Sequence, residues 1–308
     1  MRGVAGAGEA GDACPPQHRW PAVVRTGLLA VGWLIVAAGA LIARRWWLAA
    51  AAVVVIVAQV VFAAPELAAA SPVPDWARQA PTVRVFDANI DKSLVFQTGY
   101  VQAIQRERPD LITLEEFTPP ALQSMRAAGV LADFPYQCAA PAYGATGFLI
   151  ASRLPLTGCQ VRSVPWHGQG TPYMVAATWR SPGGPVALRL VHTLAPLPQY
   201  WREWTAALAA VDQSTRDSDT SSMLMVGDFN ATWNNRGFAD LLHDGLTDAA
   251  AARGNAIDMT WPNGAVVPPF VRIDHLLTGT RLAATAISTG PGFGSDHQYL
   301  TATVAIRP

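Results

Sequence analysis

The sequence predicts an α+β protein in which two packed, mostly antiparallel sheets carry helices on their outer faces, preceded by a pair of apolar helices. Three observations lead to this prediction. The chain has 308 residues, enough for one large domain. Roughly ten short strand patterns follow residue 82, many joined by hairpin-like turns, and they alternate with only three or four helical patterns. Finally, 51% of the residues are apolar, and the excess lies before residue 65.

The apolar excess falls between residues 26 and 64, where Arg44 and Arg45 are the only ionisable residues. They divide the run into segments 26–43 and 46–64, each close to the ~20 residues that cross a bilayer. We therefore expect a transmembrane helical hairpin within residues 25–64, with the two arginines in its turn. A pair of buried or interfacial helices is the alternative. A cleavable signal peptide fits poorly, because the first apolar stretch begins late and continues into a second.

The flanks of the apolar run predict irregular structure. Residues 1–24 are rich in Gly and Ala without periodicity, which is typical of a disordered tail. Residues 65–81, PELAAASPVPDWARQAP, are rich in Pro and small residues and predict a linker. The remaining residues, 82–308, form one large predicted domain.

Two weak signals bear on the side of the membrane that this domain occupies. The arginines in the short turn favour a cytoplasmic turn and an external domain, whereas those just before the first span favour the reverse. Cys138 and Cys159 bracket two predicted strands, so they either form a disulfide, which requires an oxidising compartment, or remain unpaired buried thiols. We expect a cell-membrane protein whose large domain is extracytoplasmic.

Strands and helices interleave through the first half of the large domain. TVRVFDANI (82–90) alternates like a strand with one buried face, and TGYVQAIQRERP (98–109) has helical apolar spacing and ends at a proline. DLITLEEF (110–117) is a second strand. A short helix is expected to start at Pro119 and Pro120, because Pro is favoured in the first helical turn. Three short strands occupy residues 135–163.

The second half of the domain contains a predicted hairpin at 173–180 and 186–193 with SPGGP as its turn. The clearest amphipathic helix is 198–215. Three further strands are expected at SMLMVGD (222–228), VRIDHLLTG (271–279) and YLTATVAI (299–306). No internal repeat is visible.

Acid, amide and imidazole side chains gather at the ends of these strands. Strand ends on one rim of packed sheets lie close together, so such a cluster is unfavourable unless its charges pair or bind metal. Singly, His192 could be an ordinary hydrogen-bonded residue and Asp228 a turn cap, whereas a buried unpaired carboxylate such as Asp274 would be costly. The full set is Asn89, Asp91, Glu115, Glu116, His192, Asp228, Asn230, Asp274, His275, Asp296 and His297.

Eight motifs occur in the order ANID, DLITLEEFTP, GATGFLIASRLPL, VHTLAP, GDFNATW, TWP, RIDHLL and GSDHQYL. In this order they resemble the endonuclease/exonuclease/phosphatase superfamily, which holds deoxyribonuclease I-like enzymes, abasic-site endonucleases, neutral sphingomyelinases and inositol polyphosphate 5-phosphatases. The resemblance covers about residues 82–308 and implies a four-layer α/β/β/α sandwich. With the apolar hairpin ahead of the domain, the chain looks like a membrane-attached bacterial member.

The resemblance implies a metal side of the site. Glu116 corresponds to the main Mg²⁺ ligand, while Glu115 stands where many relatives have Gln. Asn89 matches the residue that helps position metal and phosphate, and Asp296 completes the metal side. Independently of the resemblance, Mg²⁺ prefers hard oxygen ligands and keeps several waters, so one or two carboxylates and an amide suffice. Mn²⁺ would fit the same ligands.

The resemblance also implies a water-activating side. Asp228 and Asn230 match the pair that orients the attacking water and touches the scissile phosphate. His192 matches a residue that neutralises developing phosphate charge, and His297 matches the terminal imidazole, which Asp274 orients. Either Asp228 or His297 could take the proton of the water. No Cys- or Ser-based nucleophile motif occurs, so direct attack by water is the simpler prediction.

We therefore predict a membrane-anchored, metal-dependent hydrolase that cleaves a phosphoester, such as a lipid headgroup or another small phosphoester, with residues 26–64 in the membrane. From residue 71 onward, 17 Lys and Arg face 19 Asp and Glu, a net charge of −2, and no basic cluster follows residue 45. Nucleic acid is therefore a less favoured substrate. The alternatives are an extracytoplasmic nuclease and a non-catalytic membrane-tethered binding module.

Two further features concern the rim of the site. Gln298 and Tyr299 follow the terminal SDH, where many relatives have Arg or a small residue and then Pro, so a phosphate contact from that Arg is not expected. Aromatic and imidazole side chains could line a substrate rim or belong to the core. These are Trp166, His167, Trp233 and Trp261.

Overall fold

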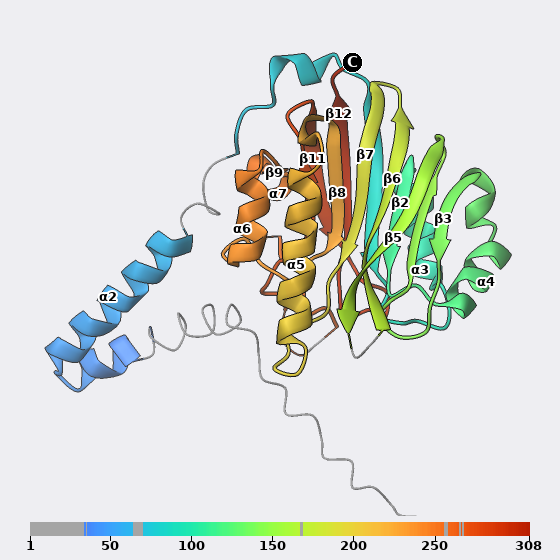
Figure 1. The fold of residues 1–308 in the computed structure, drawn as a ribbon. Helices are drawn as coiled ribbons and strands as arrows, with labels where there is room; N and C mark the ends of the chain where they lie inside the picture. Colours follow the sequence, from blue (N-terminus) through green and yellow to red (C-terminus); the bar gives the residue numbers. More distant parts are fainter. Residues whose placement is uncertain are drawn as a thin grey trace, which may run out of the picture.

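The computed structural model describes residues 34, 36–63, 70–166, 169–255, 258–264, 266 and 268–308. Its large domain consists of two six-stranded sheets packed face to face, with helices on both outer faces (Figure 1). The predicted α+β sandwich is therefore confirmed. The two sheets are mixed, since each contains one parallel pair among antiparallel ones.

The first sheet has the strand order β11-β12-β1-β2-β4-β3. Strand β1 pairs in parallel with β2, so both strands end at the same edge of the sheet. The bounds are β1 Thr82–Asn89, β2 Leu111–Glu115, β3 Tyr136–Ala140, β4 Phe148–Ser152, β11 Leu282–Gly290 and β12 Tyr299–Ile306.

The second sheet has the order β5-β6-β7-β8-β10-β9. Strands β7 and β8 are its parallel pair and also end at a common edge. The bounds are β5 Leu156–Trp166, β6 Gln169–Ser181, β7 Gly184–His192, β8 Met223–Asp228, β9 Thr247–Asp248 and β10 Asp274–Thr278.

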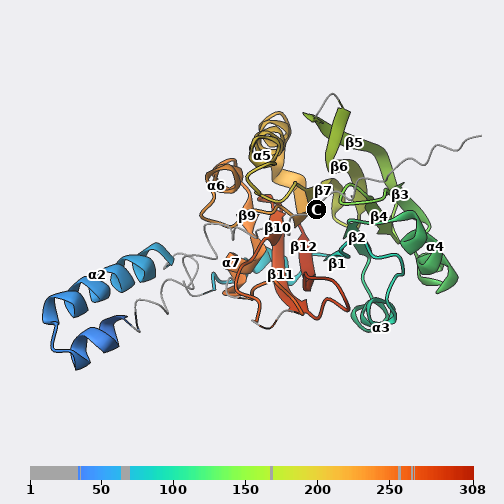
Figure 2. The same ribbon diagram turned by 90° about the horizontal axis from the view of Figure 1, so that it is seen from below.

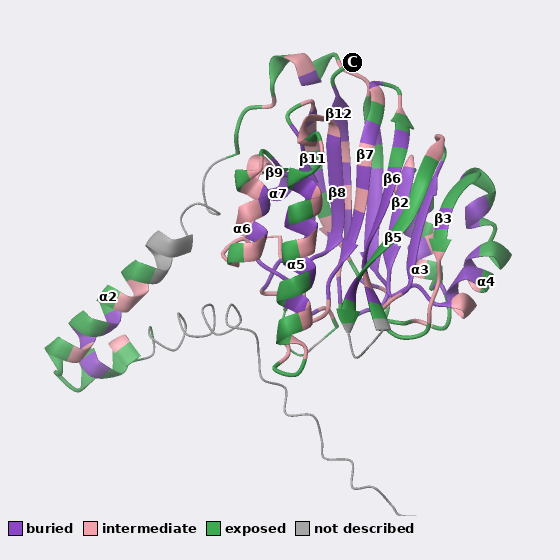
Figure 3. Cartoon of the chain, in the orientation of Figure 1, coloured by how far each residue is buried: buried purple, intermediate pink, exposed green. Residues whose placement is uncertain are grey.

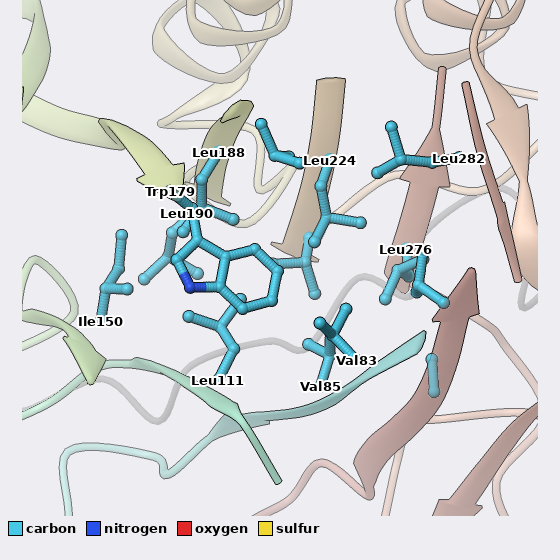
Figure 4. Close-up of a cluster of buried hydrophobic side chains, with 14 of the residues drawn as sticks. Val83, Val85, Leu111, Ile150, Trp179, Leu188, Leu190, Leu224, Leu276 and Leu282 are labelled. Atoms are coloured by element: carbon cyan, nitrogen blue, oxygen red, sulfur yellow. The ribbon is translucent and has the colours of Figure 1, made fainter. Parts of the chain in front are cut away.

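A single apolar core fills the space between the two sheets (Figure 4). It forms because alternate residues of each strand point inward, as the period of two in a strand requires. Trp179 is fully buried in this core, and its indole Nε1 donates to Ser152 Oγ at 2.8 Å. Val85, Leu190, Leu224 and Leu276 contribute from four other strands.

Helices cover both outer faces through two further apolar clusters. On the first sheet, α3 and α4 bury residues such as Tyr100 and Met125. On the second sheet, α5 and α6 bury Trp204 and Phe238. Figure 2, turned by 90° from Figure 1, shows the two helical layers apart from each other. Figure 3 shows that the strands between them are mostly buried. The bounds are α3 Thr98–Glu107, α4 Pro119–Ala127, α5 Trp201–Arg216 and α6 Arg236–His243.

Several elements were absent from the sequence prediction. Strand β11, with the sequence LAATAISTG, is rich in Ala and Thr and has a bulge near Ala284, so it lacks a clean alternation. Helix α6 and the helix α7, Ala249–Arg253, are eight and five residues long, too short for a periodic signal. Strand β9 has two residues.

The N-terminal predictions are described only in part. Helix α2, Trp46–Ala63, occupies the second predicted span. Within the part of the chain that the structure describes, no helix is both long and apolar enough to cross a membrane. The predicted tail 1–24 lies outside the described residues, as does half of the first predicted span.

The second half of the predicted linker is docked on the domain. It contains a short 3₁₀ helix, Asp75–Arg78, in which Ala77 is buried. The Ser71 backbone N–H donates to Ala252 O at 3.0 Å, and the Arg307 guanidinium lies 4.7 Å from the centre of the Trp76 ring. Figure 1 shows this segment beside the C-terminus. Residues 70–81 are thus part of the domain surface, because Ala77 and Trp76 supply apolar contacts that composition alone does not reveal.

A disulfide joins Cys138 to Cys159. Cys138 lies on β3 and Cys159 on β5, which are edge strands of different sheets. Of the two possibilities left open by the sequence, the structure contains the disulfide. It ties the two sheets together at one open edge of the sandwich.

Candidate active site

The predicted site residues meet at one rim of the sandwich because of how the strands pair. In the first sheet, Asn89 at the end of β1 lies opposite Glu115 at the end of β2. In the second sheet, Asp228 at the end of β8 lies between His192 and Asp274. These are inward-facing positions, so both sheets direct polar groups toward the same space.

Asp228 is the centre of this cluster. Its carboxylate is 1% exposed, and its Oδ2 accepts hydrogen bonds from Asn89 Nδ2 and Asn230 Nδ2, each at 3.1 Å. The Asn230 backbone N–H donates to Asp228 Oδ1 at 2.7 Å. His192 Nε2 and His297 Nε2 both lie 3.6 Å from Asp228 Oδ2. Four predicted site residues therefore surround one carboxylate oxygen.

His297 is held by Asp274, as the resemblance implied. Its Nδ1 lies 3.1 and 3.0 Å from the two oxygens of the Asp274 carboxylate, and both side chains are buried. This contact leaves Nε2 directed toward Asp228. The His297 backbone N–H donates to Ser295 Oγ at 3.0 Å, while Ser295 Oγ donates to Asn89 O at 2.7 Å. The terminal motif is thereby attached to the end of β1.

The protonation states follow from burial and from these charge pairs. Burial alone would lower the pKa of His297, but the Asp274 and Asp228 carboxylates outweigh it and raise the pKa to about 10. Burial raises the pKa of Asp228 well above its ordinary value. Burial also lowers the pKa of His192, so this imidazole is neutral at pH 7. The cluster thus combines a cationic imidazole, a neutral imidazole and a carboxyl group of increased basicity.

The glycine of GDFN is required by close packing behind Asp228. Gly227 has φ 130°, and a Cβ there would lie 2.1 Å from Val191 O and 2.6 Å from Glu115 Oε1. Any other residue would push β8 away from β7. Phe229, the next residue after Asp228, is fully buried on the opposite face against Phe238. The local sequence therefore fixes the direction of the Asp228 side chain.

Glu116 follows β2 and occupies the other side of the cluster. Its backbone has φ 50°, an uncommon value for a non-glycine residue. Its Oε1 lies 3.5 Å from His192 Nε2, and its Oε2 lies 2.6 Å from Lys92 Nζ. Burial alone would raise the pKa of Glu116, but the His192 and Lys92 side chains lower it. This carboxyl group is therefore ionised at neutral pH.

Below the rim lies a pair of buried acids, Glu115 and Asp87. Within the described residues, no amide or hydroxyl group donates to either carboxyl oxygen of Glu115 or to Asp87 Oδ2. Thr113 Oγ1 donates to Asp87 Oδ1 at 2.6 Å. Burial raises the pKa of Glu115 well above its ordinary value and that of Asp87 to about 7. Burial thus favours the protonated, neutral form of Glu115, which stands where many relatives have the neutral Gln.

Asp296 differs from the other predicted metal ligands. Its side chain is 49% exposed, and its Oδ1 lies 3.9 Å from His297 Nε2. The Trp261 indole Nε1 donates to Asp296 Oδ2 at 3.0 Å. Trp261 thus contacts a predicted ligand, which supports its assignment to the rim.

The donor atoms at the rim suit a divalent metal ion. Asn89 and Glu116 offer hard oxygens of the kind that Mg²⁺ and Mn²⁺ prefer, and Asp296 can approach from solvent. Within the described residues, the only three acids or imidazoles that converge to within 4.8 Å are Asp228, Asp274 and His297. These three residues were predicted to be catalytic, and one of them, Asp228, is bonded to Asn89.

The remaining predicted rim residues divide into two groups. Trp233 packs against the apolar cluster under α5 and α6, whereas His167 and the side chain of Trp166 lie outside the described residues. Tyr299 stacks on Phe86 in the outer core, 4.9 Å between ring centres, so it faces away from the site.

Several supporting residues were missed by sequence reasoning. Thr193 O accepts from Asn230 Nδ2 at 2.9 Å, and Thr260 Oγ1 accepts from the backbone N–H of Asp274 at 3.3 Å. Lys92 contacts Glu116. Each lies in or beside a recognised motif, namely VHTLAP, TWP or ANID, and this adjacency is the only signal that the sequence offers.

Comparisons with solved structures support the fold. A protein from Beutenbergia cavernae described as an endonuclease/exonuclease/phosphatase has a TM-score of 0.57 and 18% identity over 73% of this chain and 72% of its own. TDP2 from D. rerio, complexed with a single-strand DNA product, has a TM-score of 0.60 and 17% identity over 72% and 98%. The 3′ phosphatase NExo from Neisseria, bound to a product DNA hairpin, has a TM-score of 0.59 and 20% sequence identity. The match covers 71% of this chain and 98% of that one.

The comparison with curated proteins found no match. The model of one protein family, described as the Endonuclease/Exonuclease/phosphatase family, matches residues 89–297. This range begins at Asn89 and ends at His297, and thus includes every predicted site residue. The chain belongs to the endonuclease/exonuclease/phosphatase family of hydrolases that act on phosphoester bonds.

Proposed function

We propose that this protein is a Mg²⁺- or Mn²⁺-dependent phosphoesterase that cleaves its substrate by direct attack of water. The observation that carries the proposal is the environment of Asp228 Oδ2, which two amides and two imidazoles surround within 3.6 Å. Such a convergent set of buried polar groups is typical of a site that orients a small reactive molecule.

Glu116, Asn89 and Asp296 would hold the metal ion. When bound, the ion polarises the phosphoryl oxygen and stabilises charge on the departing one. The chain itself supplies the rest. Asn89 Nδ2 and Asn230 Nδ2 fix the direction of the Asp228 carboxylate. Asn89 was assigned to positioning the metal and the phosphate, and Asn230 to the pair that orients the water.

Asp228, one of the two candidates that the sequence left open, is the proposed general base. Its raised pKa makes it a better proton acceptor than an ordinary carboxylate. His297 already carries a proton at neutral pH, because its pKa is about 10. The imidazolium therefore serves to neutralise negative charge on the phosphoryl group, with Asp274 holding it in place. His192 is proposed to donate to the same charge from the other side.

The substrate is proposed to be a small phosphoester or a nucleic acid end. The fold relatives with DNA products favour nucleic acid as a candidate, and the net charge of −2 after residue 70 favours a small substrate. A lipid headgroup in the anchoring membrane is less favoured than the sequence suggested. Thr82, where the docked segment 70–81 meets the first strand, and Asn89 at the site stand at opposite ends of β1, roughly 25 Å apart.

Membrane attachment through residues 26–64 and an extracytoplasmic domain are retained as parts of the proposal. The apolar composition of residues 26–64 supports attachment. The bond between Cys138 and Cys159 supports an oxidising compartment, since disulfides persist there and are rare in the reducing cytosol. Labelling of Cys14 by an impermeant thiol reagent in whole cells would test the topology. Absence of labelling in intact cells with labelling after lysis would contradict an external domain.

The substrate class is tested by incubating the full-length protein with Mg²⁺ and three substrate sets: DNA with blocked or phosphorylated 3′ ends, soluble inositol phosphates, and vesicles that contain phospholipid headgroups. We expect turnover of at least one soluble set above that of the vesicles. Turnover of vesicles alone would contradict the substrate assignment. Absence of metal-stimulated turnover on all three sets, and on a chromogenic bis-aryl phosphate as a fourth substrate, would favour the non-catalytic binding module.

A further inference from the structure

The chain contains one lysine, Lys92, among its 22 Lys and Arg residues, and this lysine is at the candidate active site. It lies in the loop between β1 and α3, three residues after Asn89. Its Nζ is 2.6 Å from Glu116 Oε2 and 3.0 Å from Asp91 Oδ1. All other basic side chains apart from His are guanidinium groups, so a compact ammonium occurs only where it contacts the predicted metal ligand.

The backbone holds this lysine in place. Asp91 and Lys92 have φ values of 47° and 54°, two successive left-handed residues of which neither is glycine. Such conformations cluster at functional sites and persist only when surrounding contacts support them. The Asp91 N–H donates to Asn89 Oδ1 at 2.9 Å, and Thr118 Oγ1 donates to Ser93 O at 2.6 Å. The loop is therefore fastened to both sides of the site.

The two ends of the Lys92–Glu116 pair differ in exposure. The Lys92 side chain is 47% exposed, whereas that of Glu116 is 11% exposed. The Lys92 ammonium lies between two carboxylates, because Asp91 Oδ1 contacts the same Nζ as Glu116 Oε2. A half-exposed lysine with four rotatable bonds can leave a nearly buried carboxylate without disturbing the core.

A divalent metal ion and an ammonium group at Glu116 Oε2 repel each other and draw on the same carboxylate charge, so each weakens the binding of the other. We propose that Lys92 and the metal ion compete for Glu116, and that the displaced ammonium moves to the substrate phosphate and contributes to its binding. The second step rests on the proposed phosphoesterase function, whereas the competition does not. In the metal-free protein, the Lys92 ammonium then occupies the position beside Glu116 Oε2 that the metal ion takes when it binds.

Metal binding without substrate tests the competition. We expect the full-length Lys92→Gln variant to bind Mn²⁺ roughly tenfold more tightly than the wild type by calorimetry, since a charge-assisted contact at Glu116 is removed. Arg78→Gln, which removes an exposed cation at the far end of the domain, serves as the matched control and should leave the affinity unchanged. Equal Mn²⁺ affinity of Lys92→Gln and wild type would overturn the competition.

The single lysine also permits a direct measurement. After reductive ¹³C-methylation, the only modified amines are Lys92 and the N-terminus, so one side-chain NMR signal reports on Lys92. Mg²⁺ is diamagnetic and should shift this signal in the wild type, while the same addition to Glu116→Gln should not. An unchanged chemical shift of the Lys92 signal in the wild type on addition of Mg²⁺ would also overturn the proposal.

Kinetics test the second step. With the soluble substrate that the wild type turns over, Lys92→Gln should raise KM about tenfold at saturating Mg²⁺ with a smaller change in kcat, and Lys92→Arg should restore most of the loss. An unchanged KM would overturn the transfer to phosphate. A wild type without turnover would instead contradict the proposed function, and the Mn²⁺ affinities would still decide the competition.

Discussion

The space between the two sheets has two regions, an apolar core and a polar cluster at the rim, and the same strands contribute side chains to both. Along most of their length, β7, β8 and β10 point apolar side chains inward, among them Leu190, Val226 and Leu276. Two residues nearer the rim, on the same faces of these strands, stand His192, Asp228 and Asp274. One step of the strand period, roughly 7 Å, thus separates a dry core from a polar cluster.

The difference shows how a sheet can hold groups that would not gather on their own. Burying several carboxyl groups together is unfavourable, as the raised pKa values of Asp228 and Glu115 indicate. The apolar region supplies the stability that lets the polar region persist. Changes in the apolar region should therefore alter stability, and changes in the polar region should alter activity first.

The largest effect is expected from the polar region. Asp228→Asn and His297→Ala should each lower kcat/KM by about 10²–10⁴-fold, because they remove the proposed base or the cationic imidazole. The measurement is turnover of a chromogenic bis-aryl phosphate by the purified full-length protein. Asp75→Asn, a change at a 98% exposed carboxylate, is the control. Near-wild-type activity in His297→Ala would contradict the role given to that residue.

The apolar region should respond in the opposite way. Leu224→Ala should lower the free energy of unfolding by about 2–5 kcal/mol, since it leaves a cavity in the inter-sheet core. The folded fraction should retain kcat and KM close to wild type. Denaturant unfolding and kinetics on the same sample check both statements. A large loss of kcat at unchanged stability would break the division between the two regions.

The open edge of the sandwich offers the next test. The bond between Cys138 and Cys159 closes a separation of 21 residues, so its loss should cost about 3 kcal/mol of stability. Thermal unfolding of a Cys138→Ala, Cys159→Ala double variant should show Tm lowered by roughly 6–12 °C for a domain of this size. If reduction of the wild type with dithiothreitol left Tm unchanged, the disulfide would contribute nothing to stability.

The pH dependence of stability concerns the His297–Asp274 pair in metal-free protein. The pKa of His297 is raised above its unfolded value of 6.5 to about 10. Its contribution to stability is therefore fully present below about pH 6.5 and is lost as the pH rises toward 10. The difference in unfolding free energy between wild type and His297→Ala should shrink over this range. A difference that grows with pH would contradict a cationic His297.

The smallest effect is expected at the exposed margin of the site. Asp296 is half exposed and lies 3.9 Å from His297, so Asp296→Asn should lower kcat/KM by less than about tenfold. The same assay at low and saturating Mg²⁺ separates metal binding from turnover. A loss comparable to that in Asp228→Asn would place Asp296 among the essential ligands.

Much of the site could be predicted from the sequence, because its residues stand at strand ends in recognisable motifs. Asn89, Asp228 and His297 meet as expected. The partners that fix them were not predictable, since Thr193 and Thr260 act through a backbone carbonyl or a common hydroxyl. Lys92 was overlooked because a single charge in a loop is normally a solvated residue.

The fold shows a similar limit. Strong periodicity identified β1, β8 and α5, whereas β11 and α6 lacked it and were missed. The order of the strands within each sheet, and the packing of residues 70–81 on the domain, arise from long-range contacts that no local pattern encodes.

The most direct test of the central claim is the metal dependence of turnover in wild type and Glu116→Gln. We expect chelator-treated wild-type protein to be inactive on a bis-aryl phosphate and to regain activity on titration with Mg²⁺ or Mn²⁺. Glu116→Gln, with an unchanged Tm, should stay at least about 10²-fold less active at every metal concentration. Wild-type turnover that survives chelation, or that Glu116→Gln shares, would contradict a metal-dependent phosphoesterase built around this rim.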